Sequence, residues 1–217
     1  MIGVKLRPEP TPPDFDFDTR VRVPGNAWLA ANPKAPTKDW PPLWRHAMPS
    51  LRTAYKGVCA YFCCYVAEAT GGGSADHFVP KSDPRNRKDT YEWDNYRFAC
   101  TRMNSRKRDA SDVIDPIGLA DGLFVLVFST MRVKPAAGLP APVLKDVKGT
   151  IKRLKLNSQE CVAERQGHWD NYDRHGLSAA RFIEFAPFIA MEAARQGLLK
   201  PADHGVTVAS IRTWLDS

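Results

Sequence analysis

The residues best suited to chemistry lie in one stretch of the chain, between positions 76 and 107. Asp76 and His77 are adjacent, and the amide side chains of Asn95 and Asn104 follow them. Carboxylate and amide oxygens are the hard ligands that Mg²⁺ and Mn²⁺ prefer, and an imidazole can accept a proton from water. This set of side chains could therefore hold one divalent metal, activate a water molecule and cleave a phosphodiester bond.

Each of these four side chains has an expected role. Asp76 and Asn104 are the candidate metal ligands, with water and phosphate filling the other positions. His77 is the candidate general base, and Asn95 could fix its tautomer through a hydrogen bond. Neighbouring residues of a regular strand point to opposite faces, so Asp76 and His77 need a twist or bulge to serve one site. On these residues alone, a capping or surface Asp-His pair is the alternative.

The same stretch is strongly basic. Residues 81–108 contain nine basic and four acidic residues, and so carry +5 of the chain's net charge of +7. A local positive field favours a polyanionic partner, because neutralising phosphates releases counterions. A solvated charged face is the alternative explanation of the charge.

The composition is that of an ordinary globular protein. The 217 residues are 43% hydrophobic and 25% charged, which suits one domain or a small domain with an appendage. No apolar run is long enough to cross a bilayer and residues 1–18 lack a signal-peptide core, so we expect a cytoplasmic protein without a membrane partner. Five cysteines in this setting argue against a disulfide framework.

Prolines and apolar spacing divide the chain into segments. Nine prolines in residues 1–42 argue against a long helix, so we expect an extended arm with a short strand at 21–23. A helix is expected over 43–57, because apolar residues recur there at steps of three and four. Beyond Pro135, we expect helices at 143–154, 158–172, 178–199 with a break at Pro187, and 206–215.

Around the Asp-His pair, the expected order is strand, loop, strand and helix. The strands are predicted at 75–79 and 95–100, the loop at 80–90, and the helix at 102–108 with Thr101 as its N-cap. A further pair of strands is expected at 122–128 and 131–134. The sequence thus predicts an α+β fold with an extended N-terminal arm (1–42), a core (43–135) and a helical C-terminal region packed on that core (136–217).

Several short words in this region occur together in one known family. The chain resembles the HNH endonucleases, also called ββα-metal or His-Me finger nucleases, and in particular a bacterial subgroup of defence and mobile-element loci. The resemblance covers roughly residues 55–160. The words that carry it are Cys59-Ala60-Tyr61, Asp76-His77-Phe78-Val79-Pro80-Lys81-Ser82, Tyr91-Glu92-Trp93-Asp94-Asn95, Ala99-Cys100, Asn104-Ser105-Arg106-Lys107, Asp115-Pro116 and Ile151-Lys152-Arg153-Leu154-Lys155-Leu156-Asn157.

The resemblance implies a ββα-metal finger core and a role for each matching residue. Asp76 corresponds to the metal-binding acid and His77 to the general base. Asn95 corresponds to the central asparagine that positions the base, and Asn104 to the last metal ligand. The nucleic-acid contacts implied are Lys81, Arg102, Arg106 and Lys107.

One departure from the family pattern concerns a structural zinc. Many relatives hold the finger with two cysteine pairs, which here would involve Cys59, Cys63 or Cys64, and Cys100. The second pair is incomplete because position 103 is Met, a poor zinc ligand. The zinc is therefore either absent or completed by another residue. In the alternative, Cys59, Cys63, Cys100 and Met103 pack as a small apolar plug.

The resemblance implies an endonuclease that uses Mg²⁺ or Mn²⁺ to hydrolyse DNA, in bacterial defence against phage or plasmid DNA. The alternative is a catalytically silent subunit that binds nucleic acid within a larger complex. The C-terminal helices carry no recognisable chemistry, and docking of other subunits of a defence system is the role expected for them.

Overall fold

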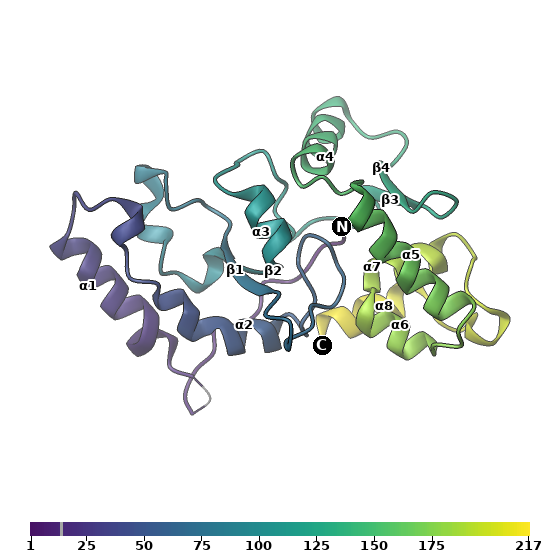
Figure 1. Ribbon diagram of the computed structural model, residues 1–217, viewed down its shortest axis with the longest axis horizontal. Coiled ribbons are helices and arrows are strands. Elements are labelled where there is room, and N and C mark those ends of the chain that lie inside the picture. The colour runs from purple at the N-terminus through teal and green to yellow at the C-terminus, as the bar shows by residue number, and fades with distance from the viewer. Residues whose placement is uncertain (14) are drawn as a thin grey trace.

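Two small antiparallel sheets are embedded in a mostly helical chain (Figure 1). The computed structural model describes residues 1–13 and 15–217, apart from the side chains of residues 84–86. Strand β1 (Gly73–His77) pairs with β2 (Tyr96–Cys100), and β3 (Phe124–Val127) pairs with β4 (Arg132–Pro135). This mixture of helices and antiparallel strands is compatible with the predicted α+β class. The α-helices are α1 (Val23–Ala31), α2 (Met48–Ala54), α3 (Thr101–Lys107), α4 (Ala141–Arg153), α5 (Gln159–Asp173), α6 (Ala179–Phe185), α7 (Pro187–Arg195) and α8 (Val208–Asp216).

The segment around the Asp-His pair forms a hairpin that leads directly into a helix. β1 and β2 pair along their whole length, and α3 follows β2 at once and packs on both strands. The predicted order of strand, loop, strand and helix is confirmed. β1 ends two residues earlier than expected, because the backbone N–H of Val79 bonds to the side chain of Asn95. Cys100 takes the N-cap position expected for Thr101.

The N-terminal segment is not the extended arm that its prolines suggested. A π-helical turn (Asp18–Arg22) leads into α1, so the strand expected at 21–23 is wrong. Pro24 lies in the first turn of α1, where its missing N–H costs no helical hydrogen bond. Pro49 has the same place in α2, which follows a 3-10 turn (Leu43–Ala47) within the predicted helix 43–57.

The C-terminal half is helical as predicted. The break expected at Pro187 separates α6 from α7, because proline cannot continue the hydrogen-bond ladder of α6. Ser178 caps α6 with its side chain, and Thr207 forms a capping box with Ser210 at the start of α8. No helix within the described residues is long and apolar enough to cross a membrane.

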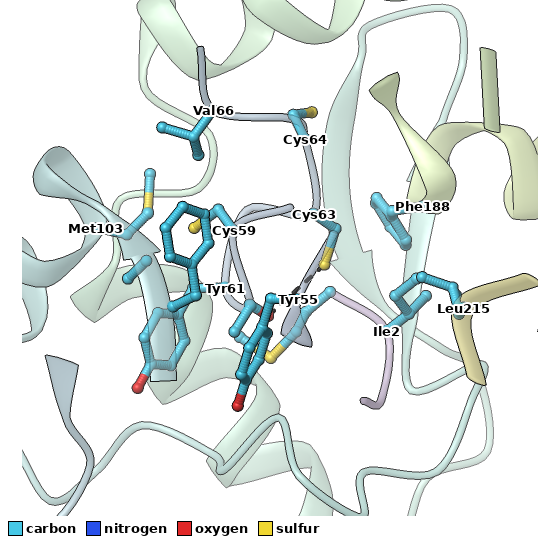
Figure 2. Packing of buried hydrophobic residues seen from close by; sticks show 14 of the residues in the cluster. Ile2, Tyr55, Cys59, Tyr61, Cys63, Cys64, Val66, Met103, Phe188 and Leu215 are labelled. Carbon is cyan, nitrogen blue, oxygen red and sulfur yellow. Dashed lines mark hydrogen bonds between the residues drawn. The ribbon is translucent and has the colours of Figure 1, made fainter. Parts of the chain in front are cut away.

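A single hydrophobic cluster joins the hairpin to the C-terminal helices. Figure 2 shows Met103 of α3 and the cysteine-rich segment on one side, with Phe188 of α7 and Leu215 of α8 on the other. Ile2 fills the space between them, so the N-terminal segment is part of this core. The hairpin and α3 therefore share one hydrophobic core with distant parts of the chain.

We expect Gly25→Ala to destabilise the protein by about 1–3 kcal/mol, because added volume in a packed site forces its neighbours apart. A Cβ at this buried position of α1 would lie 2.3 Å from Cγ of Tyr91. Chemical denaturation would measure the change. Gly167→Ala in α5 is the matched control, since nothing lies within 4 Å of its added Cβ. That control should stabilise the protein by up to about 1 kcal/mol, and equal stabilisation by both changes would contradict the packing of α1 on Tyr91.

Candidate functional site

Asp76 and His77 lie side by side on β1 and point to opposite faces of the hairpin. Asp76 contacts α3, whereas the ring of His77 contacts Trp44 and Tyr96. The twist or bulge that would turn both side chains to one face is not seen, since β1 and β2 pair in continuous register. His77 is the last residue of β1.

The carboxylate of Asp76 is held in a buried ion pair. Its side chain is 2% exposed and lies 3.2 Å from Nζ of Lys107, which is itself fully buried. Tyr61 donates its hydroxyl to the same carboxylate at 2.5 Å. The ammonium also donates to the backbone carbonyls of His77 and Phe78, each at 3.0 Å. Burial raises the pKa of Asp76, and the charge of Lys107 acts in the opposite direction.

Asn104 lies one turn before Lys107 on the same face of α3. Its Nδ2 donates to Oγ of Ser74 at 3.2 Å and to the carbonyl of Ala75 at 3.3 Å. The structure thus brings Asp76, Asn104 and Lys107 together where α3 crosses β1. Among the described residues no hydrogen bond engages Oδ1 of Asn104, which leaves this oxygen available as a ligand.

The imidazole of His77 lies in an aromatic cage. Its ring centroid is 4.9 Å from that of Trp44 and 5.1 Å from that of Tyr96, both edge-on. Nε2 is buried, and no hydrogen-bond partner for it is found in the described structure. Burial lowers the pKa of His77 to about 3, helped by the charge of Lys81 and opposed by a backbone hydrogen bond with Thr90. The ring is therefore neutral at physiological pH.

Asn95 holds a loop, and within the described contacts it does not bond to His77. Its Oδ1 accepts from the backbone N–H of Val79 at 2.7 Å. Its Nδ2 donates to the carbonyls of Val79 at 3.1 Å and Asp89 at 2.9 Å. Asn95 thereby fixes both ends of the loop that leads to Thr90, so its effect on the imidazole is indirect.

The predicted phosphate-binding residues have internal partners. Lys81 lies over the ring of Trp44, with Nζ 3.8 Å from the centroid. Arg102 and Arg106 share Glu160 at 2.6 and 2.8 Å. Lys107 is committed to Asp76. The basic stretch is therefore less available to a polyanion than its charge count suggests.

The cysteines expected around a zinc are only partly assembled. Sγ of Cys59 accepts from the backbone N–H of Cys100 at 3.3 Å, and a hydrogen bond from the Cys59 thiol helps to lower the pKa of Cys100 to about 7. The thiol of Cys63 instead points to the carbonyl of Ala60 at 3.7 Å (Figure 2). Across residues 1–13 and 15–217, no group of three or more His, Cys, Asp or Glu side chains is arranged to hold a metal ion.

Three contributors to this site were not expected from the sequence. Tyr61 bonds Asp76, Trp44 covers His77, and Thr90 contacts the imidazole through its backbone. Tyr61 lies within one of the family words, which was the only sign of its importance. Trp44 and Thr90 reach His77 through tertiary packing, and no local sequence pattern marks them as its neighbours.

Comparisons with known proteins leave the chain without an assigned family. No family model matches it, and no curated protein matches it.

We expect Lys107→Met to destabilise the fold by about 3–5 kcal/mol, because it leaves the Asp76 carboxylate buried without its counter-charge. Chemical denaturation would measure the loss, and the double variant Asp76→Asn with Lys107→Met should recover part of it. Arg102→Met on the same helix is the control. Its ion pair with Glu160 is 53% and 46% exposed, so it should cost no more than about 1 kcal/mol. An equal loss of stability in Lys107→Met and Arg102→Met would contradict the assigned role of Lys107.

The lowered pKa of His77 predicts a loss of stability in acid. The unfolded chain takes up a proton near the ordinary value of 6.5, whereas the folded ring stays neutral down to about 3. The free energy of unfolding should therefore fall as the pH drops through this range, by at most about 1.4 kcal/mol per pH unit from this residue. His77→Gln should flatten this part of the profile, as measured by urea unfolding. A slope for His77→Gln equal to that of the wild type would exclude a buried neutral imidazole.

Proposed function

We propose that the protein is a metal-dependent endonuclease of the HNH type that hydrolyses DNA phosphodiester bonds. One observation carries the proposal. α3 sets Lys107 against Asp76 of β1, and it sets Asn104, one turn earlier, against Ser74 and Ala75 of the same strand. Asp76, Asn104 and Lys107 come from two separate words of the family pattern, and they meet on a strand, strand and helix unit of the order that the family uses. Bacterial defence against phage or plasmid DNA is the biological role that the resemblance suggests.

The donor atoms near Asp76 suit a hard cation. The carboxylate of Asp76, Oδ1 of Asn104 and the carbonyls of His77 and Phe78 are all oxygens, the ligand type of Mg²⁺ and Mn²⁺. The ammonium of Lys107 already donates to three of these groups: the carboxylate of Asp76 and the carbonyls of His77 and Phe78. Asp76 and Asn104 are the residues that would hold the metal. When bound, it would supply charge stabilisation for phosphorus and for the leaving oxygen.

His77 is the base in this proposal. A general base must be unprotonated at the working pH, and the aromatic cage keeps its imidazole neutral. Nε2 lacks a partner within the described residues, so it is the nitrogen that can accept a proton from water. Asp76 and His77 are both buried, so a phosphodiester reaches them only if the side chains that cover them move. Access of water requires the Trp44 ring, with Lys81 on it, to move aside.

A catalytically silent DNA-binding subunit is the second candidate function. The buried ion pair favours it, since Lys107 neutralises the carboxylate that would bind the metal. In that case the same residues serve only to lock α3 onto β1.

Plasmid nicking distinguishes the two functions. Supercoiled plasmid would be incubated with the protein and Mg²⁺ or Mn²⁺, with EDTA as the blank. The wild type should yield open circles, and His77→Ala should slow nicking by about 10²–10⁴-fold, the usual contribution of a general base. His46→Ala is the matched control and should nick at the wild-type rate. Thermal unfolding of each variant would confirm that it is folded.

Nicking by His77→Ala at the wild-type rate would overturn the role of His77 as the base. Binding of plasmid without cleavage in either metal would overturn the nuclease and establish the silent subunit.

A further inference from the structure

The exposed positive charge of the protein is concentrated on β4 and α4, outside the Asp-His region. Residues 132–155 contain seven basic residues and one acidic residue, which makes a net charge of +6. All seven are exposed. In contrast, Arg97 and Lys107 of the basic stretch at 81–108 are buried, and Arg106 is bonded to the protein. The exposed basic side chains therefore gather on residues 132–155, and fewer of those at 81–108 are free at the surface.

Three lysines of α4 form a row along the helix. Lys145, Lys148 and Lys152 follow one another at steps of three and four residues, which places them on one face. Val147 and Thr150 are fully buried on the opposite face. With a rise of 1.5 Å per residue, the row is about 10 Å long. We call these three residues the lysine row.

The lysine row is not neutralised by the protein. Among the described residues, no ion pair joins Lys145, Lys148 or Lys152 to a carboxylate. Like charges at these spacings repel each other and weaken an isolated helix. An external polyanion would remove this repulsion, whereas a purely structural helix gains nothing from the row.

α4 packs beside β4 (Figure 1) and bonds to the segment that follows α3. The backbone N–H of Ile114 donates to Oγ1 of Thr150 at 2.9 Å, and Arg153 pairs with Asp112 at 3.1 Å. Arg106 of α3 donates to the carbonyl of Leu154 at 3.1 Å, just past the end of α4. The C-terminal end of α4, which carries Lys152, is therefore joined to α3.

We propose that the lysine row binds the phosphate backbone of duplex DNA and guides it to the candidate site. The choice of DNA rests on the proposed function. Over about 10 Å of duplex, each strand carries about three phosphate charges, which matches a row of three cations. α4 contains no aromatic residue, so it offers no ring on which bases of a single strand could stack. Lysine charges fix the position of the backbone and do not read bases, so the binding is independent of sequence.

Binding to a labelled 20-base-pair duplex tests the proposal, with EDTA present so that cleavage plays no part. In the triple variant Lys145→Gln, Lys148→Gln and Lys152→Gln, the dissociation constant should rise about tenfold or more. The slope of its logarithm against the logarithm of the salt concentration should fall by about 3. Replacing the same lysines with arginine should preserve binding. The matched control is Arg20→Gln, Lys34→Gln and Lys38→Gln, which removes the same charge from exposed positions of the N-terminal segment.

A dissociation constant and salt slope equal to those of the wild type in the row variant would overturn the proposal, as would an equal loss in the control variant. Tighter binding of single-stranded DNA or of an acidic peptide would overturn the assignment to duplex DNA. The outcome is separate from that of the nicking assay. Loss of binding in the row variant of a protein that does not nick would support the surface and reject the nuclease. Nicking by the wild type, together with unchanged DNA binding in the row variant, would support the nuclease and reject the lysine row as the DNA-binding surface.

Discussion

The buried ion pair between Lys107 and Asp76 is the constraint on which the site depends. It joins the last residue of α3 to β1, and its ammonium also donates to the carbonyls of His77, which ends the strand, and of Phe78, which follows it. Such a pair survives burial only when its remaining hydrogen-bonding capacity is used, and Tyr61 supplies the further donor. Because α3 cannot slide past β1, Asn104 is fixed over Ser74 and Ala75. Stability and the proposed metal chemistry thus compete for one carboxylate.

The second constraint is the alternation of side chains along β1. It gives Asp76 a polar, charged surrounding under α3 and gives His77 an aromatic one under Trp44. The pKa of Asp76 is raised and that of His77 is lowered, and burial is the main cause of both shifts. Burial penalises whichever form is charged, so it favours a protonated acid and an unprotonated base.

The sequence predicted the elements whose signals are local. The break at Pro187, the amphipathic helix α4 and the order of hairpin and helix around Asp76 follow from proline chemistry, periodicity and strand composition. The extended arm expected from the prolines of the N-terminal segment is wrong, because Pro24 fits the first turn of a helix. The partners of Asn95, Lys81 and Arg106 could not be predicted. Lys81 contacts a ring from a distant segment, and Asn95 and Arg106 donate to backbone carbonyls, which leave no mark in the sequence. A charge count likewise cannot tell a buried cation such as Lys107 from an exposed one such as Lys148.

The hydrogen bonds of Asn95 have a consequence for how this fold can vary. One side chain closes the base of the 80–88 loop by bonding Val79 at one end and Asp89 at the other. Closing a longer loop costs little extra entropy once its ends are fixed. Insertions in this loop would therefore leave the register of the hairpin intact while reshaping the surface next to His77. The loop can thus change in length without rebuilding the core.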